Sequence, residues 1–268
     1  MTSRPQGPAR TCAPAPALAA LGDTCAPRHA AVLAPVMPRW DHGAFFRQVA
    51  EPLLASRHRI SIYDTLSLLR PGDDLKALVG RWADYLGSRD DTPDVLAGNA
   101  LGGAVVQALL AHEWTHRAKV LLLSGPTVAD EELNTELERI AAAVGNQGLP
   151  AALHLLEDVV RGPGAGRSIQ PPTVQPPAAD EEAAGQRLSA GLRLLRDADA
   201  GGPVRDFPGP LLHLYGEQSL LVRRRHLATG PGPQHRIVGI PQAGMRPHAD
   251  QPSLTRDAIA RFLGAEEQ

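Results

Sequence analysis

Short apolar runs alternate with amphipathic segments along the first half of the chain. The apolar runs predict buried strands at residues 30–34, 59–63, 94–97 and 119–123. Between them, apolar residues recur at helical spacing and predict helices at residues 45–56, 74–86 and 101–111. Strands that alternate with helices are typical of an α/β fold, in which a mostly parallel sheet carries helices on both faces.

The alternation stops after residue 127. Three helical patterns follow at residues 128–144, 149–160 and 181–196, with a Pro/Gly-rich loop at 161–179. Strand patterns return at 211–215 and 236–240, before a final helix at 253–263. A helical insertion therefore interrupts an α/β core.

Composition and charge exclude several classes of protein. The 268 residues are 43% hydrophobic and carry a formal net charge of −2, which is typical of a globular protein. A near-neutral charge gives no electrostatic reason to expect nucleic acid or an anionic membrane as a partner. No run of 18 apolar residues is present, so no membrane-spanning helix is expected.

The first 28 residues have a different character from the rest. Prolines at positions 14 and 16 interrupt any continuous apolar run, so we interpret residues 1–28 as a flexible extension and not as a signal peptide. The two cysteines, Cys12 and Cys25, lie here and are expected to be free thiols. A cytoplasmic location is therefore the default expectation.

Four segments together resemble the α/β-hydrolase family. They are residues 32–37, where the family has a strand and its oxyanion-hole loop; 59–64, the next strand; 95–103, at the nucleophile elbow; and 244–252, at the loop of the catalytic histidine. The resemblance covers nearly everything after residue 30. It implies an α/β-hydrolase core at residues 29–126 and 204–268, with a helical cap at 127–203.

The elbow has a physical logic that this sequence keeps only in part. A nucleophile on a tight strand-to-helix turn needs small neighbours, and Gly98, Gly102 and Gly103 supply them. The nucleophile position itself is Ala100, however, and a methyl group cannot attack a carbonyl.

The resemblance places the other two triad members at Ser219, where the family has Asp, and at Met245, where it has His. The usual His-Gly of the oxyanion loop is Pro35-Val36. With all three positions of the usual triad replaced, the sequence argues against ester, amide or epoxide hydrolysis by the family's route.

Three residues are candidates to replace the lost catalytic groups. His248, three residues after Met245, is either a structural partner for backbone or an acid or donor facing the pocket. Ser124 ends a strand beside the expected pocket, and Asn99 flanks the elbow, where it serves either the turn or a bound carbonyl. The predicted substrate-binding residues, including the oxyanion loop and the elbow, are Val36, Met37, Asp41, His42, Tyr63, Ala100, Leu101 and Met245. Asp41 has a second interpretation, as an N-cap for the following helix.

One further motif concerns metals. Residues 112–116 read His-Glu-Trp-Thr-His, which matches the H-E-x-x-H pattern of zinc peptidases. The motif ends a predicted helix just before a strand, which favours a surface helix end. No metal and no cofactor are expected.

Four functional hypotheses follow. The first is a non-hydrolytic enzyme that catalyses cyclisation, rearrangement, elimination or decarboxylation of a mid-sized apolar metabolite by shape and oxyanion polarisation. The second is a pseudo-hydrolase that only binds a small molecule or a partner. The third is a hydrolase with relocated residues, such as Ser124 with His248, and the fourth is a zinc peptidase through His112 and His116. The GC-rich composition suggests a polyketide-like substrate by association, and the oligomeric state, with a homodimer among the options, stays open.

Overall fold

The protein is described here by a computed structural model, which covers residues 15–161, 178–196 and 198–264. These residues form a seven-stranded sheet in the order β1-β3-β2-β4-β5-β6-β7. Only the β1–β3 pair is antiparallel, and the other neighbours are parallel. The strands are β1 (Leu18–Leu21), β2 (Arg28–Leu33), β3 (His58–Tyr63), β4 (Val95–Asn99), β5 (Lys119–Leu123), β6 (Leu211–Gly216) and β7 (His235–Ile240). The predicted mostly parallel α/β sheet is confirmed.

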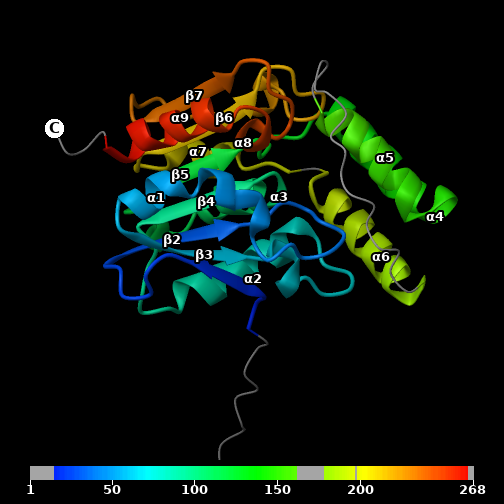
Figure 1. Cartoon of the computed structure of the whole chain (residues 1–268), viewed down its shortest axis with the longest axis horizontal. Coiled ribbons are helices and arrows are strands. Elements are labelled where there is room, and N and C mark those ends of the chain that lie inside the picture. The colour runs from blue at the N-terminus through cyan, green and yellow to red at the C-terminus, as the bar shows by residue number, and fades with distance from the viewer. Residues whose placement is uncertain (1–14, 162–177, 197, 265–268) are drawn as a thin grey trace, which may run out of the picture.

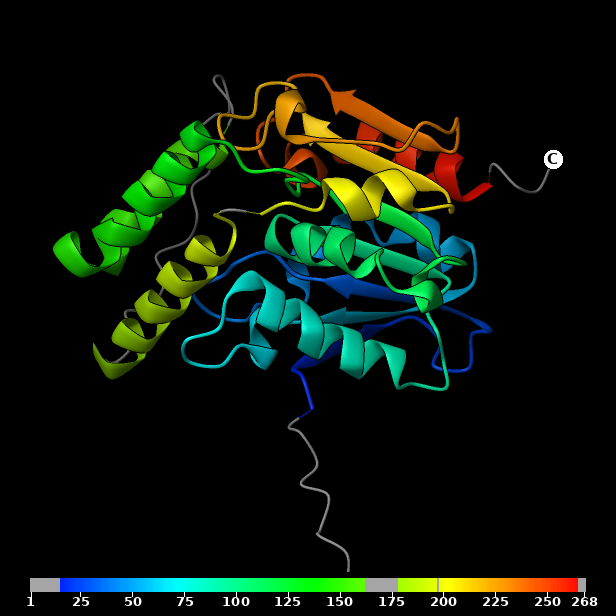
Figure 2. The same ribbon diagram turned by 180° about the vertical axis from the view of Figure 1, so that it is seen from behind.

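Helices cover both faces of the sheet. The α-helices are α1 (Glu51–Ala55), α2 (Leu75–Gly87), α3 (Leu101–Leu109), α4 (Glu131–Gln147), α5 (Leu149–Val160), α6 (Ala178–Leu194), α7 (Gly201–Asp206), α8 (Pro247–Asp250) and α9 (Pro252–Gly264). Four short 3₁₀ turns in the described residues are η1 (Ala44–Val49), η2 (Thr65–Leu68), η3 (Glu113–Thr115) and η4 (Arg224–His226). Figure 1 looks onto the face with α1 and α9, and Figure 2 shows the opposite face with α2, α3 and α7.

The two faces bury separate apolar clusters because successive side chains of a strand point to opposite sides. In β2, Ala31 and Leu33 join the cluster under α2 and α3, while Ala30 and Val32 join the cluster under α1 and α9. Strands β2, β4, β5 and β6 are therefore buried on both faces along most of their length, which explains why they read as apolar runs, whereas β7 is only partly buried.

The edge strand β1 corrects the prediction that residues 1–28 form a flexible extension. Leu18–Leu21 pairs with β3, from Leu18 opposite Tyr63 to Leu21 opposite Ile60. Cys25, in the following turn, is a free and exposed thiol. Residues 1–14, with Cys12, lie outside the described residues.

The helix predicted at 45–56 is divided into η1 and α1. Pro52 lies in the first turn of α1 and has no backbone N–H to donate to a preceding turn, so a continuous helix cannot run through it. The other predicted helices and strands are present, with bounds shifted by at most three residues.

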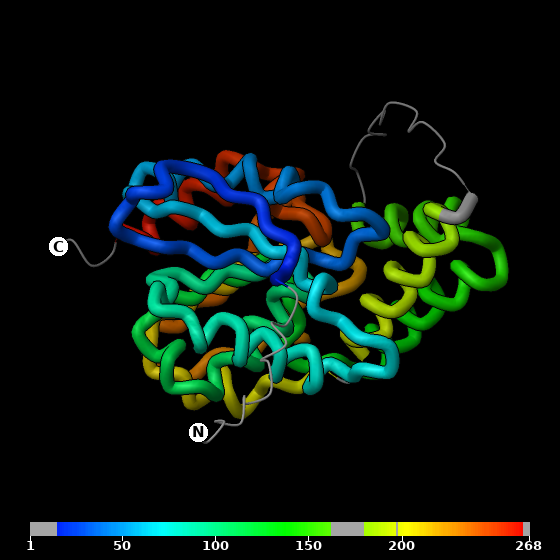
Figure 3. The backbone as a smooth tube through the Cα atoms, turned by 90° about the horizontal axis from the view of Figure 1, so that it is seen from below, coloured from blue at the N-terminus to red at the C-terminus, as the bar shows by residue number. Residues whose placement is uncertain are grey.

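Helices α4, α5 and α6 pack together on one side of the sheet core (Figure 3). The chain enters and leaves this helical segment at one point, because Val128 and Asp199 form an antiparallel bridge. Beside it, Ala200 N–H donates to the Thr127 carbonyl at 2.8 Å. Most of the Pro/Gly-rich loop, 162–177, lies outside the described residues. Across the described ranges, none of the helices combines the length and apolarity that a bilayer crossing requires.

Candidate functional site

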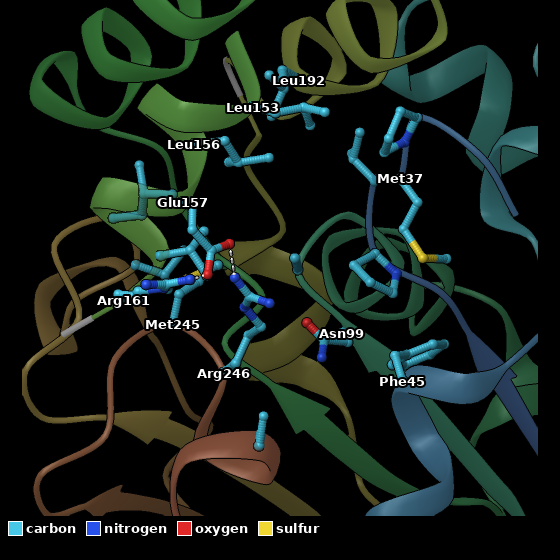
Figure 4. Close-up of a pocket in the computed structure, with 18 of the residues that line it drawn as sticks. Met37, Phe45, Asn99, Leu153, Leu156, Glu157, Arg161, Leu192, Met245 and Arg246 are labelled. Carbon is cyan, nitrogen blue, oxygen red and sulfur yellow. Dashed lines mark hydrogen bonds and ion pairs between the residues drawn. The ribbon is translucent and has the colours of Figure 1, made fainter. Parts of the chain in front are cut away.

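A cavity of about 900 Å³ lies between the carboxyl ends of the strands and helices α4–α6. The loops after β2, β4, β5 and β7 form its floor, and apolar side chains of the helices form its roof (Figure 4). The apolar lining residues include Met37, Phe45, Leu133, Leu137, Leu153, Leu156, Leu192, Leu195, Leu221 and Met245. A cavity of this size and lining suits a mid-sized, largely apolar ligand.

The elbow keeps its strained backbone although it carries no nucleophile. Ala100 lines the cavity with φ 48° and ψ −111°, a conformation that an L-residue adopts at a cost of about 1–3 kcal/mol. The glycines beside it leave no room for a side chain, as the resemblance implies for this turn. A Cβ added to Gly98 would overlap the carbonyl of Gly102, and one added to Gly102 would overlap the carbonyl of Leu33.

The two residues that the resemblance assigns to the other triad positions contact each other. The Ser219 hydroxyl donates to the Met245 sulfur across 3.7 Å. Met245 lines the cavity, whereas Ser219 is buried behind it. Neither side chain can activate a nucleophile or a water molecule as a general base at neutral pH.

Helix α3 begins directly after Ala100, which lines the cavity. Leu101, Gly102 and Gly103 open helix α3, so their N–H groups have no carbonyl of their own helix to bind. Val36 and Met37 line the cavity on the loop after β2, as predicted. The side chain of Leu101 is fully buried in the core, so only its backbone can serve the site, and its N–H stays a predicted oxyanion donor.

Arg187 of α6 fixes the loop after β2. Its Nε donates to the Met37 carbonyl at 2.9 Å, and its guanidinium pairs with the buried Asp64. Asp64 in turn accepts from the Leu66 N–H at 3.2 Å. The helical segment thus holds in place the backbone that borders the cavity.

His248, in α8, is a buried titratable residue of the cavity lining. It is 3% exposed, and its Nδ1 lies 3.4 Å from the Asn99 amide nitrogen. Burial, helped by the Arg246 charge, lowers the pKa of His248 to about 4. Because an amide nitrogen only donates, Nδ1 accepts and the neutral ring carries its proton on Nε2. Phe45 packs edge-on against the ring at 6.3 Å.

A second buried imidazole gives a prediction about acid stability. Burial lowers the pKa of His213, on β6, to about 3. Below pH ~6.5 the unfolded chain binds protons at His213 and His248 that the folded protein does not, so the free energy of unfolding decreases with falling pH. The expected slope is about 1.4 kcal/mol per pH unit for each imidazole, down to pH ~4 for His248 and ~3 for His213.

Urea unfolding between pH 8 and pH 4 measures this slope. Replacing His213 by Leu is expected to remove the contribution of His213 to this slope and to keep the free energy of unfolding at pH 7. The control His42→Gln, at an exposed position, is expected to leave the slope unchanged. An unaltered slope in the Leu variant would show that His213 is not the group responsible.

Besides Leu101 and Ser219, three predicted site residues do not line the cavity: Ser124, Tyr63 and His42. Ser124 is fully buried, and its hydroxyl has no hydrogen-bond partner among the described residues. The structure therefore does not pair Ser124 with His248. Tyr63 is fully buried, stacked edge-on against Trp82 at 5.5 Å in the core.

His42 is exposed, its ring centroid lies 6.2 Å from that of Trp40, and it does not line the cavity. Asp41 does line the cavity, but its carboxylate is engaged. It accepts from the Gly43 N–H at 2.8 Å and from the Phe45 N–H at 2.9 Å. Asp41 therefore bonds to the start of η1, but the N-cap residue of that turn is Gly43 and not Asp41, which the alternative interpretation predicted.

The H-E-x-x-H motif does not form a helical ligand pair. Helix α3 ends at Leu109, and the motif continues as a 3₁₀ turn, in which residues four apart do not share a face. The His112 ring stacks on Trp114, and the His116 ring meets Phe207. Within the described ranges, no group of three or more His, Cys, Asp or Glu residues is placed to hold a metal ion.

Sequence reasoning missed Arg39 and a cluster of three further charged residues in the cavity wall. Glu157 accepts from Arg161 Nε at 2.5 Å and pairs with Arg246, which lies in the loop before α8 (Figure 4). The signal in the sequence is the i,i+4 spacing of Glu157 and Arg161, but it gives no hint of the distant third partner.

Comparisons with known proteins agree on the fold alone. The chain matches no protein-family model, and no curated protein is significantly similar to it in sequence. Among solved structures, it is similar to a hydrolase from Pseudomonas aeruginosa PA01, with 18% identity over 92% of this chain and 93% of that one and a TM-score of 0.73.

The α/β hydrolase MGS-M2 from a Medee basin deep-sea metagenome library also has a TM-score of 0.73, with 13% identity over 92% and 94% of the two chains. A thermophilic esterase from Thermogutta terrifontis has a TM-score of 0.66, with 20% identity over 93% of each chain. The chain therefore has the α/β-hydrolase fold.

Proposed function

We propose that this protein is a non-hydrolytic enzyme built on the α/β-hydrolase fold. It binds a mid-sized, largely apolar, polyketide-like metabolite over Ala100 and promotes its cyclisation, rearrangement, elimination or decarboxylation. In this proposal residues 127–203 act as a cap, and the chain needs no metal or cofactor. The supporting observation is that the strained elbow persists without a nucleophile while a neutral, buried imidazole borders the same cavity.

Each part of the site has a role in this proposal. The N–H of Leu101 and the backbone of Val36 or Met37 polarise a substrate carbonyl. His248, neutral with its proton on Nε2, donates to developing charge, and Asn99 holds its tautomer. The leucines of α4, α5 and α6 fold the substrate into a reactive conformation.

A second candidate is a pseudo-hydrolase that binds a small molecule without turnover. The observation that favours it is the inert contact between Ser219 and Met245, where lost chemistry has left only packing. Incubation with a metabolite extract of the source cells, followed by mass spectrometry, separates the two candidates. An isomeric product, or one lacking water or carbon dioxide, supports the enzyme. A compound retained unchanged supports the binding protein.

Restoring the triad tests whether Ala100, Ser219 and Met245 are its lost positions. Ala100→Ser alone is expected to hydrolyse p-nitrophenyl acetate at the background rate, because Met245 cannot accept the proton. The triple variant Ala100→Ser, Ser219→Asp, Met245→His is expected to exceed background by about 10²-fold. A triple variant with Ser219→Asn in place of Asp is the matched control. If the single variant hydrolysed the ester above background and as fast as the triple variant, a relocated base would be indicated. If the triple variant stayed at background, the three assigned positions would be wrong.

A further inference from the structure

Two guanidinium groups share one carboxylate in the wall of the cavity. Glu157 of α5 bonds to Arg161 one turn further on and to Arg246 of the loop after β7. The side chains of Arg161, Glu157 and Arg246 are 26%, 31% and 38% exposed, so the cluster is partly open. Figure 4 shows it on the side of Met245, across the cavity from Met37 and Phe45.

Among the residues that the structure describes, this cluster leaves one positive charge without a counter-ion. The two arginines lower the pKa of Glu157, so its carboxylate stays ionised at neutral pH and cancels only one of them. The other acidic residue of the wall, Asp41, is bonded to two backbone N–H groups on another loop. The remaining cation of the wall, Arg39, donates to the Asp180 carbonyl at 3.3 Å.

The surplus charge sits at one end of an apolar cavity. A buried or half-buried guanidinium is stabilised by a planar oxyanion that accepts two parallel N–H bonds. The leucines and Phe45 offer the rest of the volume to an apolar body. An amphipathic monoanion satisfies both halves of the cavity.

We infer that the cavity is specific for apolar molecules that carry one carboxylate, which Arg246 and Arg161 bind beside Glu157. This inference rests on the proposed function and narrows its substrate class. The carboxylate would lie close to the acid–base group of the site, because Arg246 is two residues from His248 and its charge acts on that imidazole. An anion bound at Arg246 would partly cancel this charge.

Calorimetric titration at pH 8 with dodecanoate and with dodecan-1-ol tests the inference, because the two probes share the chain and differ in charge. Wild-type protein is expected to bind dodecanoate about 10-fold or more tightly than the alcohol. Arg246→Gln is expected to remove that preference and to leave alcohol affinity unchanged. Glu157→Gln is expected to strengthen dodecanoate binding, since it frees both guanidiniums. Arg117→Gln, an exposed arginine outside the cavity wall, is the matched control.

The outcomes separate this inference from the proposed function. Equal affinity for acid and alcohol, unchanged by Arg246→Gln, would overturn carboxylate recognition and leave an apolar binding cavity intact. Binding of neither probe would count against the proposed cavity as well. A dodecyl phosphate arm identifies the preferred oxyanion, and tighter phosphate than carboxylate binding would contradict the carboxylate assignment. If Arg246→Gln fails to fold, two other variants decide the case. Arg161→Gln is expected to weaken dodecanoate binding, whereas Glu157→Gln is expected to strengthen it.

Discussion

Replacing Gly102 by Ala is expected to destabilise the protein by about 3 kcal/mol, the upper end of the range for overpacking a tight core. The added methyl group would overlap the Leu33 carbonyl, which belongs to the backbone of the central strand β2. Backbone cannot move aside as a flexible side chain can, so helix α3 would have to shift away from β2. That shift would also displace Ala100 and the first N–H groups of α3.

Gly145→Ala is the matched control for this prediction. Gly145 lies within α4, and a Cβ added there meets nothing within 4 Å. Alanine favours a helix by up to about 1 kcal/mol over glycine, so this variant is expected to gain stability. Urea unfolding followed by circular dichroism measures both. A Gly102→Ala variant as stable as the wild type would show that the backbone of Gly102 does not pack tightly against the Leu33 carbonyl.

Replacing His248 by Phe is expected to lower the turnover of the substrate by about 10²-fold or more, the usual contribution of a positioned acid or base. Phenylalanine keeps an aromatic ring at this position and removes the Nε2–H donor and the contact to Asn99. Rates are measured by product formation under saturating substrate, so that kcat is separated from KM.

His154→Gln is the matched control, because His154 also lines the cavity but is exposed. It is expected to retain turnover within a few-fold. If His248→Phe turned over normally while remaining folded, His248 would have only a structural role, and the proposed chemistry would have to rest on the backbone N–H groups alone.

The elements with strong local patterns could be predicted from the sequence. Strands β4 and β5 are apolar runs buried on both faces, and α2 is preceded by its N-cap Asp74, whose carboxylate accepts from the Ala77 N–H. The edge strand β1 could not be predicted in the same way. Its Leu-Ala-Ala-Leu sequence has no alternation, and its partner β3 lies about 40 residues further along the chain.

The cavity-lining residues were predictable where the position of the backbone alone decides whether a residue lines the cavity. Val36, Met37, Ala100 and Met245 line the cavity because each directly follows a strand or its turn. Side-chain direction was not predictable at Tyr63, which the register of β3 points into the core. The Glu157–Arg246 pair was missed because it joins segments 89 residues apart.

The central claim is that this cavity converts its ligand without adding water. The most direct test is incubation with the metabolite extract in H₂¹⁸O, with boiled protein as the control and mass spectrometry of the consumed and formed species. The account predicts a product that is isomeric with its precursor, or lighter by water or carbon dioxide, and that contains no enzyme-dependent ¹⁸O. A product carrying one ¹⁸O from solvent would identify a hydrolase and contradict the account.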